Sequence, residues 1–196
     1  MSERIAAITR TTTETNVAVK LNIDGSGNAT IRTGIPFLDH MLTLFAKHAL
    51  FDLEVLCKGD LEIDAHHSVE DTGICLGLAL DKALGDKQGI LRFAHAYYPM
   101  DETLVRVAVD LSGRPCLVYD LKIERERIGT LDADLLEEFW KAITTHARLT
   151  LHFGLLYGKN THHIFEAAFK AAARALSIAA RLEPRVQGVP STKGVL

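Results

Sequence analysis

The second half of this chain repeats the sequence pattern of the first. The segment HHSVEDTG begins at His66 and HHIFEAAF begins at His162, about half of the 196-residue chain apart, and both read His-His-x-x-Glu. Two further segments correspond, ETNVAVKLNIDGSG from Glu14 and ETLVRVAVDLSG from Glu102. Each has apolar residues at every second position and then a Ser-Gly turn, which is typical of a half-buried strand. A repeat of this size indicates two copies of one folding unit.

The remaining segments keep the same order in both halves. FAKHALFDLEV from Phe45 and TTHARLTLHF from Thr144 each pass from a helical pattern through His-Ala into an alternating strand. Pro36 suits the first turn of a helix, and Gly85 suits a helix end. The periodicity predicts strands at 4–13, 16–24, 28–33, 51–58, 92–98, 103–111, 115–120 and 149–157, and helices at 36–48, 66–84, 132–147 and from 161 onward.

These elements predict an α+β fold built as a tandem repeat of two half-domains packed as one unit. The repeats cover approximately 1–90 and 91–185 of a single catalytic unit, 1–196. The segment 186–196 has no periodicity and is expected to be a C-terminal tail.

Composition excludes several classes of protein. A formal net charge of −3 gives no basic surface for nucleic acid or for an anionic membrane. No apolar run approaches the roughly 20 residues of a membrane span, and the N-terminal segment lacks an apolar signal core, so we expect a cytoplasmic chain. Cys57, Cys75 and Cys116 are odd in number and lack C-x-x-C spacing, which favours buried thiols over disulfides or a thiolate zinc site.

The His-His-x-x-Glu motifs have the spacing of metal ligands. Residues four apart on a helix share a face, whereas neighbours diverge by about 100°. His66 and Glu70 can therefore face one ion while His67 points toward another. The second motif repeats this arrangement with His162, His163 and Glu166. The motifs predict two divalent ions bound by imidazole and carboxylate, a ligand set that suits manganese, iron, nickel or zinc.

Several histidines lie outside the two motifs. His40 in GIPFLDHM and His152 in LTLHF could complete the metal shells. His48 and His146 occupy matching positions of the repeat, where a packing role is equally consistent. His95 is expected to be structural.

Seven motifs distributed from residue 10 to the C-terminus carry a resemblance to a known family. They are RTTTET, GIPFLDHML, DAHHSVEDTG, PMDET, DLSGRP, LHFGLLYGKNTHHIFEAAFKA and STKGVL. Together they resemble the imidazoleglycerol-phosphate dehydratases of histidine biosynthesis. The resemblance implies half-domains that each have a four-stranded sheet with two helices on one face. It also implies a 24-subunit shell with active sites at subunit interfaces and two Mn²⁺ ions per site.

The reaction implied by the resemblance is dehydration of D-erythro-imidazoleglycerol phosphate to imidazole acetol phosphate. The hydrogen that leaves lies on a carbon with no carbonyl beside it, and hydroxide is a poor leaving group. Metals at the ring nitrogens would favour a metal-bound imidazolate, which can expel the hydroxyl from the adjacent carbon. A base then removes the proton from the next carbon, and the resulting enol becomes a ketone.

The resemblance also suggests roles for individual residues. Glu14 in RTTTET resembles the catalytic glutamate of the family, and Asp101 in PMDET is a second acid–base candidate. His48 matches a position that the family usually keeps as histidine, whereas the family often has another residue at His146, which we leave out of the site. Phosphate needs fixed cations and hydroxyl donors. The residues implied for it are Arg92, Arg114, Lys170, Ser191 and Lys193, so the resemblance implies that the tail at 186–196 binds substrate.

Two other classes of function use similar residues. A two-metal phosphoester hydrolase would activate water and release inorganic phosphate, whereas a dehydratase leaves the phosphate attached. A metal-storage or structural shell would need neither Glu14 nor a phosphate clamp. Nucleotide chemistry has little support, because the sequence lacks a G-x-x-x-x-G-K-[ST] loop.

Overall fold

A computed structural model describes residues 4–123 and 127–196. Both halves contain three strands, a helix, a strand and a helix in that order, and the second half has an additional short hairpin before its first helix. The first half comprises β1 (Ile5–Thr11), β2 (Thr15–Asn22), β3 (Ala29–Arg32), α1 (Pro36–Ala49), β4 (Asp52–Gly59) and α2 (His66–Leu84). The second comprises β5 (Phe93–Met100), β6 (Thr103–Asp110), β7 (Cys116–Asp120), α3 (Leu135–Ala147), β10 (Thr150–Tyr157) and α4 (Thr161–Ala180). The predicted α+β tandem repeat is confirmed.

The two four-stranded sheets have the same topology. Their strand orders are β1-β2-β4-β3 and β5-β6-β10-β7. In each sheet the third strand in the chain pairs in parallel with the strand beside it, and the other neighbours are antiparallel. This identity of register and order supports the repeat more strongly than the motifs do.

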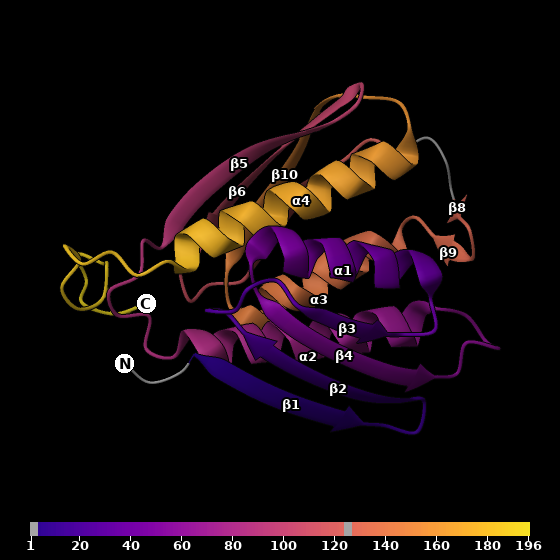
Figure 1. Cartoon of the computed structure of the whole chain (residues 1–196), viewed down its shortest axis with the longest axis horizontal. Helices are drawn as coiled ribbons and strands as arrows, with labels where there is room; N and C mark the ends of the chain where they lie inside the picture. Colours follow the sequence, from indigo (N-terminus) through magenta and orange to yellow (C-terminus); the bar gives the residue numbers. More distant parts are fainter. Residues whose placement is uncertain (1–3, 124–126) are drawn as a thin grey trace.

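The four helices lie between the two sheets (Figure 1). Helix α1 packs against α4, and α2 packs against α3, so each helix of one half contacts a helix of the other. Helix α2 also covers β1 and β2, and α4 covers β5 and β6. The two halves therefore share one apolar core.

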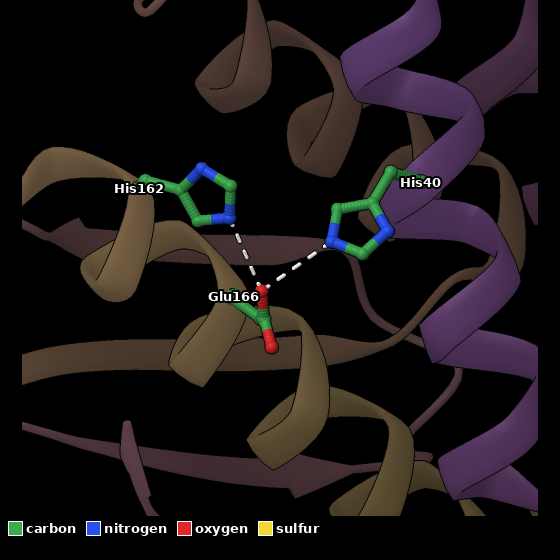
Figure 2. Close-up of side chains that lie close together, drawn as sticks. All are labelled: His40, His162 and Glu166. Carbon is green, nitrogen blue, oxygen red and sulfur yellow. Dashed lines mark hydrogen bonds and ion pairs between the residues drawn. The ribbon is translucent and has the colours of Figure 1, made fainter. Parts of the chain in front are cut away.

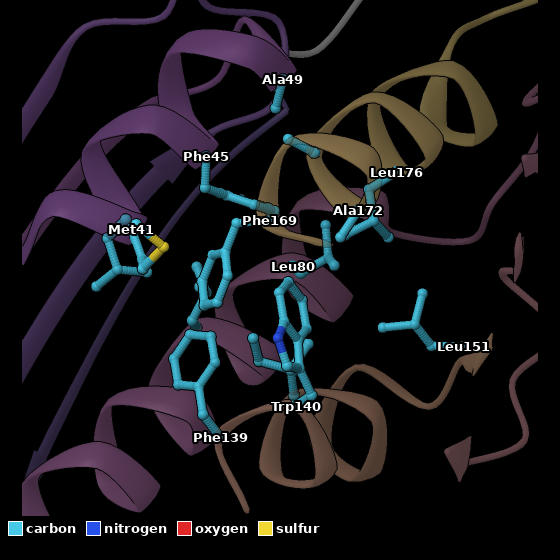
Figure 3. Packing of buried hydrophobic residues seen from close by; sticks show 14 of the residues in the cluster. Met41, Phe45, Ala49, Leu80, Phe139, Trp140, Leu151, Phe169, Ala172 and Leu176 are labelled. Carbon is cyan, nitrogen blue, oxygen red and sulfur yellow. The ribbon is translucent and has the colours of Figure 1, made fainter. Parts of the chain in front are cut away.

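Trp140 of α3 lies in the middle of this core (Figure 3). Its ring centroid lies 4.9 Å from that of Phe169, 5.0 Å from that of Phe153 and 6.2 Å from that of Phe45. These rings come from α4, β10 and α1, so one side chain links three elements. Truncating a buried aromatic side chain to alanine typically costs about 3–5 kcal/mol.

Two glycines of α2 allow its close approach to α3. A Cβ atom at Gly73 would lie 2.8 Å from the carbonyl oxygen of Phe139, and one at Gly77 would lie 2.9 Å from that of Ile143. Backbone atoms cannot move aside as a flexible side chain can. The two halves can pack at this distance only because α2 lacks side chains at both positions.

One feature of the second half differs from the prediction. A short hairpin of β8 (Arg127–Ile128) and β9 (Leu131–Asp132) precedes α3, which begins at Leu135 rather than near residue 132. Gly129 turns this hairpin with a φ of 60°, and Leu131 is buried. The described helices include none with the length and hydropathy needed to span a bilayer.

The direction of the helices positions the motifs. Helices α1, α2 and α4 begin at one end of the molecule, and the chain's C-terminus lies at the opposite end (Figure 1). Both His-His-x-x-Glu motifs are in the first turns of α2 and α4. The motifs are therefore located at the same end.

Candidate metal centre and active site

A cluster of three side chains forms where α1 packs beside α4. The Nε2 atom of His162 lies 3.2 Å from Oε2 of Glu166, and Nε2 of His40 lies 3.4 Å from the same oxygen (Figure 2). One donor atom from each of the three residues lies within 4.8 Å of the other two. Two imidazole nitrogens and a carboxylate oxygen suit a divalent transition metal. The structure thus brings His40 together with the second motif.

Lys170 holds the other oxygen of Glu166. Its Nζ donates to Oε1 of Glu166 at 2.6 Å, one helical turn along α4. Burial acts to raise the pKa of Glu166, but the hydrogen bond and charge of Lys170, with smaller contributions from His162 and His40, lower it overall. Glu166 is therefore ionised, with Oε2 directed at the two histidines. Lys170, which we predicted to bind phosphate, lies at this cluster.

The first motif is more open. Nε2 of His66 lies 3.8 Å from Oε2 of Glu70, and their side chains are 41% and 45% exposed. The predicted i, i+4 pair therefore forms on α2 as it does on α4. Its exposure leaves room for ligands from outside this chain.

The second histidine of the first motif lies between two carboxylates. Nδ1 of His67 lies 3.0 Å from Oδ2 of Asp60, and Nε2 lies 3.8 Å from Oε1 of Glu14. The hydrogen bond with Asp60 raises the pKa of His67 above its ordinary value, and the charge of Glu14 adds to this. The predicted acid–base residue Glu14 thus faces the ring edge opposite Asp60.

His163 of the second motif has the same surroundings. Its Nδ1 lies 2.7 Å from Oε2 of Glu102, and its Nε2 lies 3.7 Å from Oδ2 of Asp101. The Oε1 atom of Glu102 accepts the backbone N–H of Asn160 at 2.9 Å. The Asn160 bond and then the His163 bond lower the pKa of Glu102 to about 2. Asp101 occupies a left-handed backbone conformation, with a φ of 47°, in the β5–β6 turn.

Sequence reasoning missed Asp60 and Glu102. A signal for Glu102 was present, because Glu102-Thr103 opens β6 as Glu14-Thr15 opens β2. Asp60 lies in the β4–α2 loop, and its position beside His67 depends on how that loop folds. No repeat or motif in the sequence marks it.

A hydrogen-bonded turn positions Glu14. The hydroxyl oxygen of Thr12 accepts the backbone N–H groups of Glu14 at 3.1 Å and Thr15 at 2.9 Å. The Thr15 hydroxyl in turn donates to Asp71 of α2, which also accepts from Arg10. The β1–β2 hairpin is thus fixed to the helix that carries the first motif. Glu14 itself remains 51% exposed and free to meet a substrate.

Most of the predicted phosphate residues gather around the C-terminal tail. Nη1 of Arg92 donates to the carbonyl oxygen of Pro190 at 2.9 Å, directly before Ser191. Arg114 follows Gly113, where an added Cβ would lie 2.6 Å from the backbone carbon of Leu196. Lys193 donates its backbone N–H to the Ser191 hydroxyl.

The tail and the His40–His162–Glu166 cluster lie at opposite ends of α4. The backbone N–H of Arg92 bonds to the carbonyl oxygen of Ala179, near the last turn, whereas His162 is in the first. The rise per residue of an α-helix separates these positions by roughly 25 Å. One chain therefore does not bring its own metal motif and tail together (Figure 1).

Two predicted residues lie away from the motifs in this chain. His152 alternates on β10 with buried Leu151 and Phe153, so it points away from the helices. His48 is two turns beyond His40, about 12 Å along α1, and its ring lies against Tyr98. Burial lowers the pKa of His48, and the charges of Lys170 and Arg174 lower it further.

Comparisons with known proteins agree with the motifs. The family model described as imidazoleglycerol-phosphate dehydratase matches residues 33–176. A protein of that name from Thermoanaerobacter pseudethanolicus is 58% identical over 98% of this chain and 100% of its own length. Another from Caldanaerobacter subterraneus subsp. tengcongensis is 56% identical with the same coverage.

Two solved structures have the same fold. The Staphylococcus aureus imidazoleglycerol-phosphate dehydratase superposes with a TM-score of 0.83 and 42% identity, covering 91% of this chain and 99% of that one. The Pyrococcus furiosus enzyme, solved in complex with (S)-C348, has a TM-score of 0.83 and 40% identity, covering 96% and 100%. With matches of this identity over nearly its whole length, the chain belongs to the imidazoleglycerol-phosphate dehydratase family.

Proposed function

We propose that this chain is a hydro-lyase that dehydrates imidazoleglycerol phosphate in histidine biosynthesis. Membership of the family supports the reaction. The observation that carries the proposal in the chain itself is the convergence of His40, His162 and Glu166, three donors of a kind that binds divalent metal. In full, the proposed reaction converts the D-erythro substrate to imidazole acetol phosphate in the cytoplasm.

We propose that each active site binds two Mn²⁺ ions, although iron, nickel or zinc would fit the same donors. The residues that would hold them are His40, His66, His67, Glu70, His162, His163 and Glu166, and we retain His152 as a candidate from a neighbouring chain. When bound, the ions would act as Lewis acids and would favour the deprotonated form of the substrate's imidazole ring.

Glu14 is the proposed base. Its carboxylate is exposed beside His67, so it can meet a ring bound at the motif and take the proton from the carbon beyond the one that loses hydroxide. Asp101, beside Nε2 of His163, is the second candidate for proton transfer or for orienting the substrate. Helix α1 places the ring of His48 against Tyr98, away from the motifs, so we rank His48 last of the three catalytic candidates.

The positions of the residues proposed to bind phosphate support a site shared between chains. Arg92, Arg114, Ser191 and Lys193 gather at the tail, roughly 25 Å from the motif on α4. A substrate with one ring, three carbons and a phosphate is much shorter than this separation. The metal end of one chain must then meet the tail of another, which a closed symmetric oligomer would provide. We therefore propose a homo-oligomer, specifically a 24-subunit shell, with active sites at its interfaces.

The test is turnover by the purified chain with and without manganese. With Mn²⁺ and imidazoleglycerol phosphate, we expect a ketone product that still carries its phosphate, and chelation should abolish its formation. Inorganic phosphate as the product would favour the two-metal hydrolase instead. Bound metal with no turnover of either kind would favour a storage or structural shell.

A further inference from the structure

We propose that Glu102 and Asp60 are positioning residues that hold His163 and His67 with the proton on Nδ1 and with Nε2 free to bind a divalent metal ion. The proposal rests on the proposed function, because it concerns how the motif histidines meet their metals. It adds to the site two carboxylates that contact the proposed ligands rather than the metals, and neither the motifs nor the repeat predicted them.

The surroundings of Glu102 fix its orientation. Its Oε1 accepts the backbone N–H groups of Asn160 at 2.9 Å and Lys159 at 3.3 Å, at the start of α4. Its Oε2 is then directed at Nδ1 of His163, 2.7 Å away. An ionised carboxylate can only accept hydrogen bonds, so the shared proton must be on Nδ1. A neutral imidazole protonated there has its lone pair on Nε2.

The opposite edge of the His163 ring indicates what Nε2 is for. Nε2 lies 3.7 Å from Oδ2 of Asp101, which is longer than a hydrogen bond. A nitrogen lone pair and a carboxylate oxygen at this separation do not stabilise each other directly. A divalent cation bound at Nε2 would lie beside this carboxylate and be stabilised by its charge, and imidazole is a common ligand of such ions.

Asp60 gives His67 the same arrangement from a different part of the fold. Its Oδ2 and Oδ1 lie 3.0 and 3.2 Å from Nδ1 of His67, and Nε2 faces Glu14 at 3.8 Å. Each second histidine of a motif thus has one carboxylate on Nδ1 and another beyond Nε2. Outer carboxylates of this kind commonly set the tautomer of metal-binding histidines.

The repeat shows why two different residues serve this role. Glu14 and Glu102 occupy matching positions, directly before β2 and β6. In the second half, the carboxylate of Glu102 contacts Nδ1 of His163, and that of the neighbouring Asp101 faces Nε2. In the first half, Asp60 takes the Nδ1 side, which leaves Glu14 on the Nε2 side. We infer that Asp60 frees Glu14 for its proposed role as the base.

The sharpest variant is Glu102→Gln. The backbone N–H groups of Asn160 and Lys159 require an acceptor, so the amide oxygen stays toward them and the amide NH₂ faces His163. Nδ1 must then accept, and the ring proton moves to Nε2, the proposed ligand atom. A comparable change of carboxylate to amide beside a catalytic histidine gives the wrong tautomer in serine proteases. Glu62→Gln is the matched control, since Glu62 is an exposed carboxylate two residues after Asp60.

The experiment titrates Mn²⁺ into the metal-free full-length chain by calorimetry and records histidine tautomers by ¹H–¹⁵N NMR. We expect Glu102→Gln to weaken one of the two binding events by about 10–100-fold, with the proton of His163 on Nε2. Glu62→Gln should match the wild-type chain. Unchanged affinity or an unchanged tautomer in folded Glu102→Gln would overturn the positioning role.

A second variant keeps the test decisive if Glu102→Gln disturbs the start of α4. Asp60→Ala removes a carboxylate that contacts the ring of His67 rather than the backbone N–H groups at the start of a helix, and we expect the same loss of about 10–100-fold for the ion held by His67. Unchanged affinity in this variant would overturn the role of Asp60. A wild-type chain that binds no manganese would instead contradict the proposed function itself.

Discussion

Arg10 donates its Nε–H to the carboxylate of Asp71 at 2.8 Å, which joins the first strand to the helix of the first motif. Asp71 is only 6% exposed, and its second oxygen accepts the hydroxyl of Thr15. Glu14 lies in the turn that Thr12 and Thr15 close, between these two hydrogen bonds to Asp71 and the proposed metal ions. The position of the proposed base therefore depends on a buried carboxylate that would touch neither metal nor substrate.

Thr15→Val tests this anchor, because valine keeps the shape of threonine and removes the hydroxyl. A buried carboxylate that loses one hydrogen-bond donor costs about 1–3 kcal/mol. We expect urea unfolding to show a loss of that size, together with lower turnover from a displaced Glu14. Thr15→Ser retains the hydroxyl and should keep most of both. Equal stability of the valine variant and the wild-type chain would mean that the Asp71 bond contributes nothing.

Glu14→Gln should retain the metals and the assembly but lose most turnover. A glutamine of the same size cannot accept a proton, and general acid–base groups typically contribute about 10²–10⁴-fold. The measurements are the kcat of the manganese-loaded variant and its metal content. A variant that carries its full metal complement and turns over at the wild-type rate would remove Glu14 from the mechanism.

The strands and helices were predicted from the local periodicity of apolar residues, and this was sufficient for most of the fold. The apolar patterns and the repeat identified every strand of the two four-stranded sheets and the helices packed between them. The β8–β9 hairpin was missed because two-residue strands leave no periodicity, and α3 was consequently begun three residues too early. The i, i+4 pairs of the motifs were predictable for the same reason, since helix geometry alone brings His162 to Glu166.

What the sequence could not provide were contacts set by the tertiary fold. Asp60 reaches His67 through an irregular loop, and Asp71 reaches Arg10 across 61 positions of chain. The distance between the metal motif and the tail was predictable in principle, because a helix of known length separates them. The proposal of a site shared between chains needed one further observation, that Arg92 lies at the far end of that helix.

His48 gives a prediction for pH. Burial lowers its pKa below the ordinary value of about 6.5, so an unfolded chain binds a proton more readily than the native one as the pH falls. The contribution of neutral His48 to stability is complete above about pH 6.5 and is lost as the pH falls through the lowered pKa. The difference in unfolding free energy between the wild-type chain and His48→Gln, both without metal, should therefore shrink in acid. A difference that stays constant from pH 7.5 to pH 5, or grows, would contradict a lowered pKa for His48.

The tail should act through the substrate's phosphate. Deleting residues 190–196 should leave the fold and the metal content intact and weaken substrate binding sharply. Lys193→Ala should have a smaller effect, about 1.5–3 kcal/mol for a lost charged hydrogen bond. An analogue without the phosphate should bind the truncated and full chains equally. If truncation weakens both ligands to the same extent, the tail is not a phosphate clamp.

The most direct test of a site shared between chains is complementation of two defective variants. His162→Ala lacks a proposed metal ligand, and the chain truncated after residue 189 lacks the tail, so each alone should have little activity. Assembled together in equal amounts, about a quarter of the sites would combine an intact metal end with an intact tail from another chain. We predict recovery of about that fraction of the wild-type turnover. Activity no greater than the sum of the two separate variants would contradict a site built from two chains.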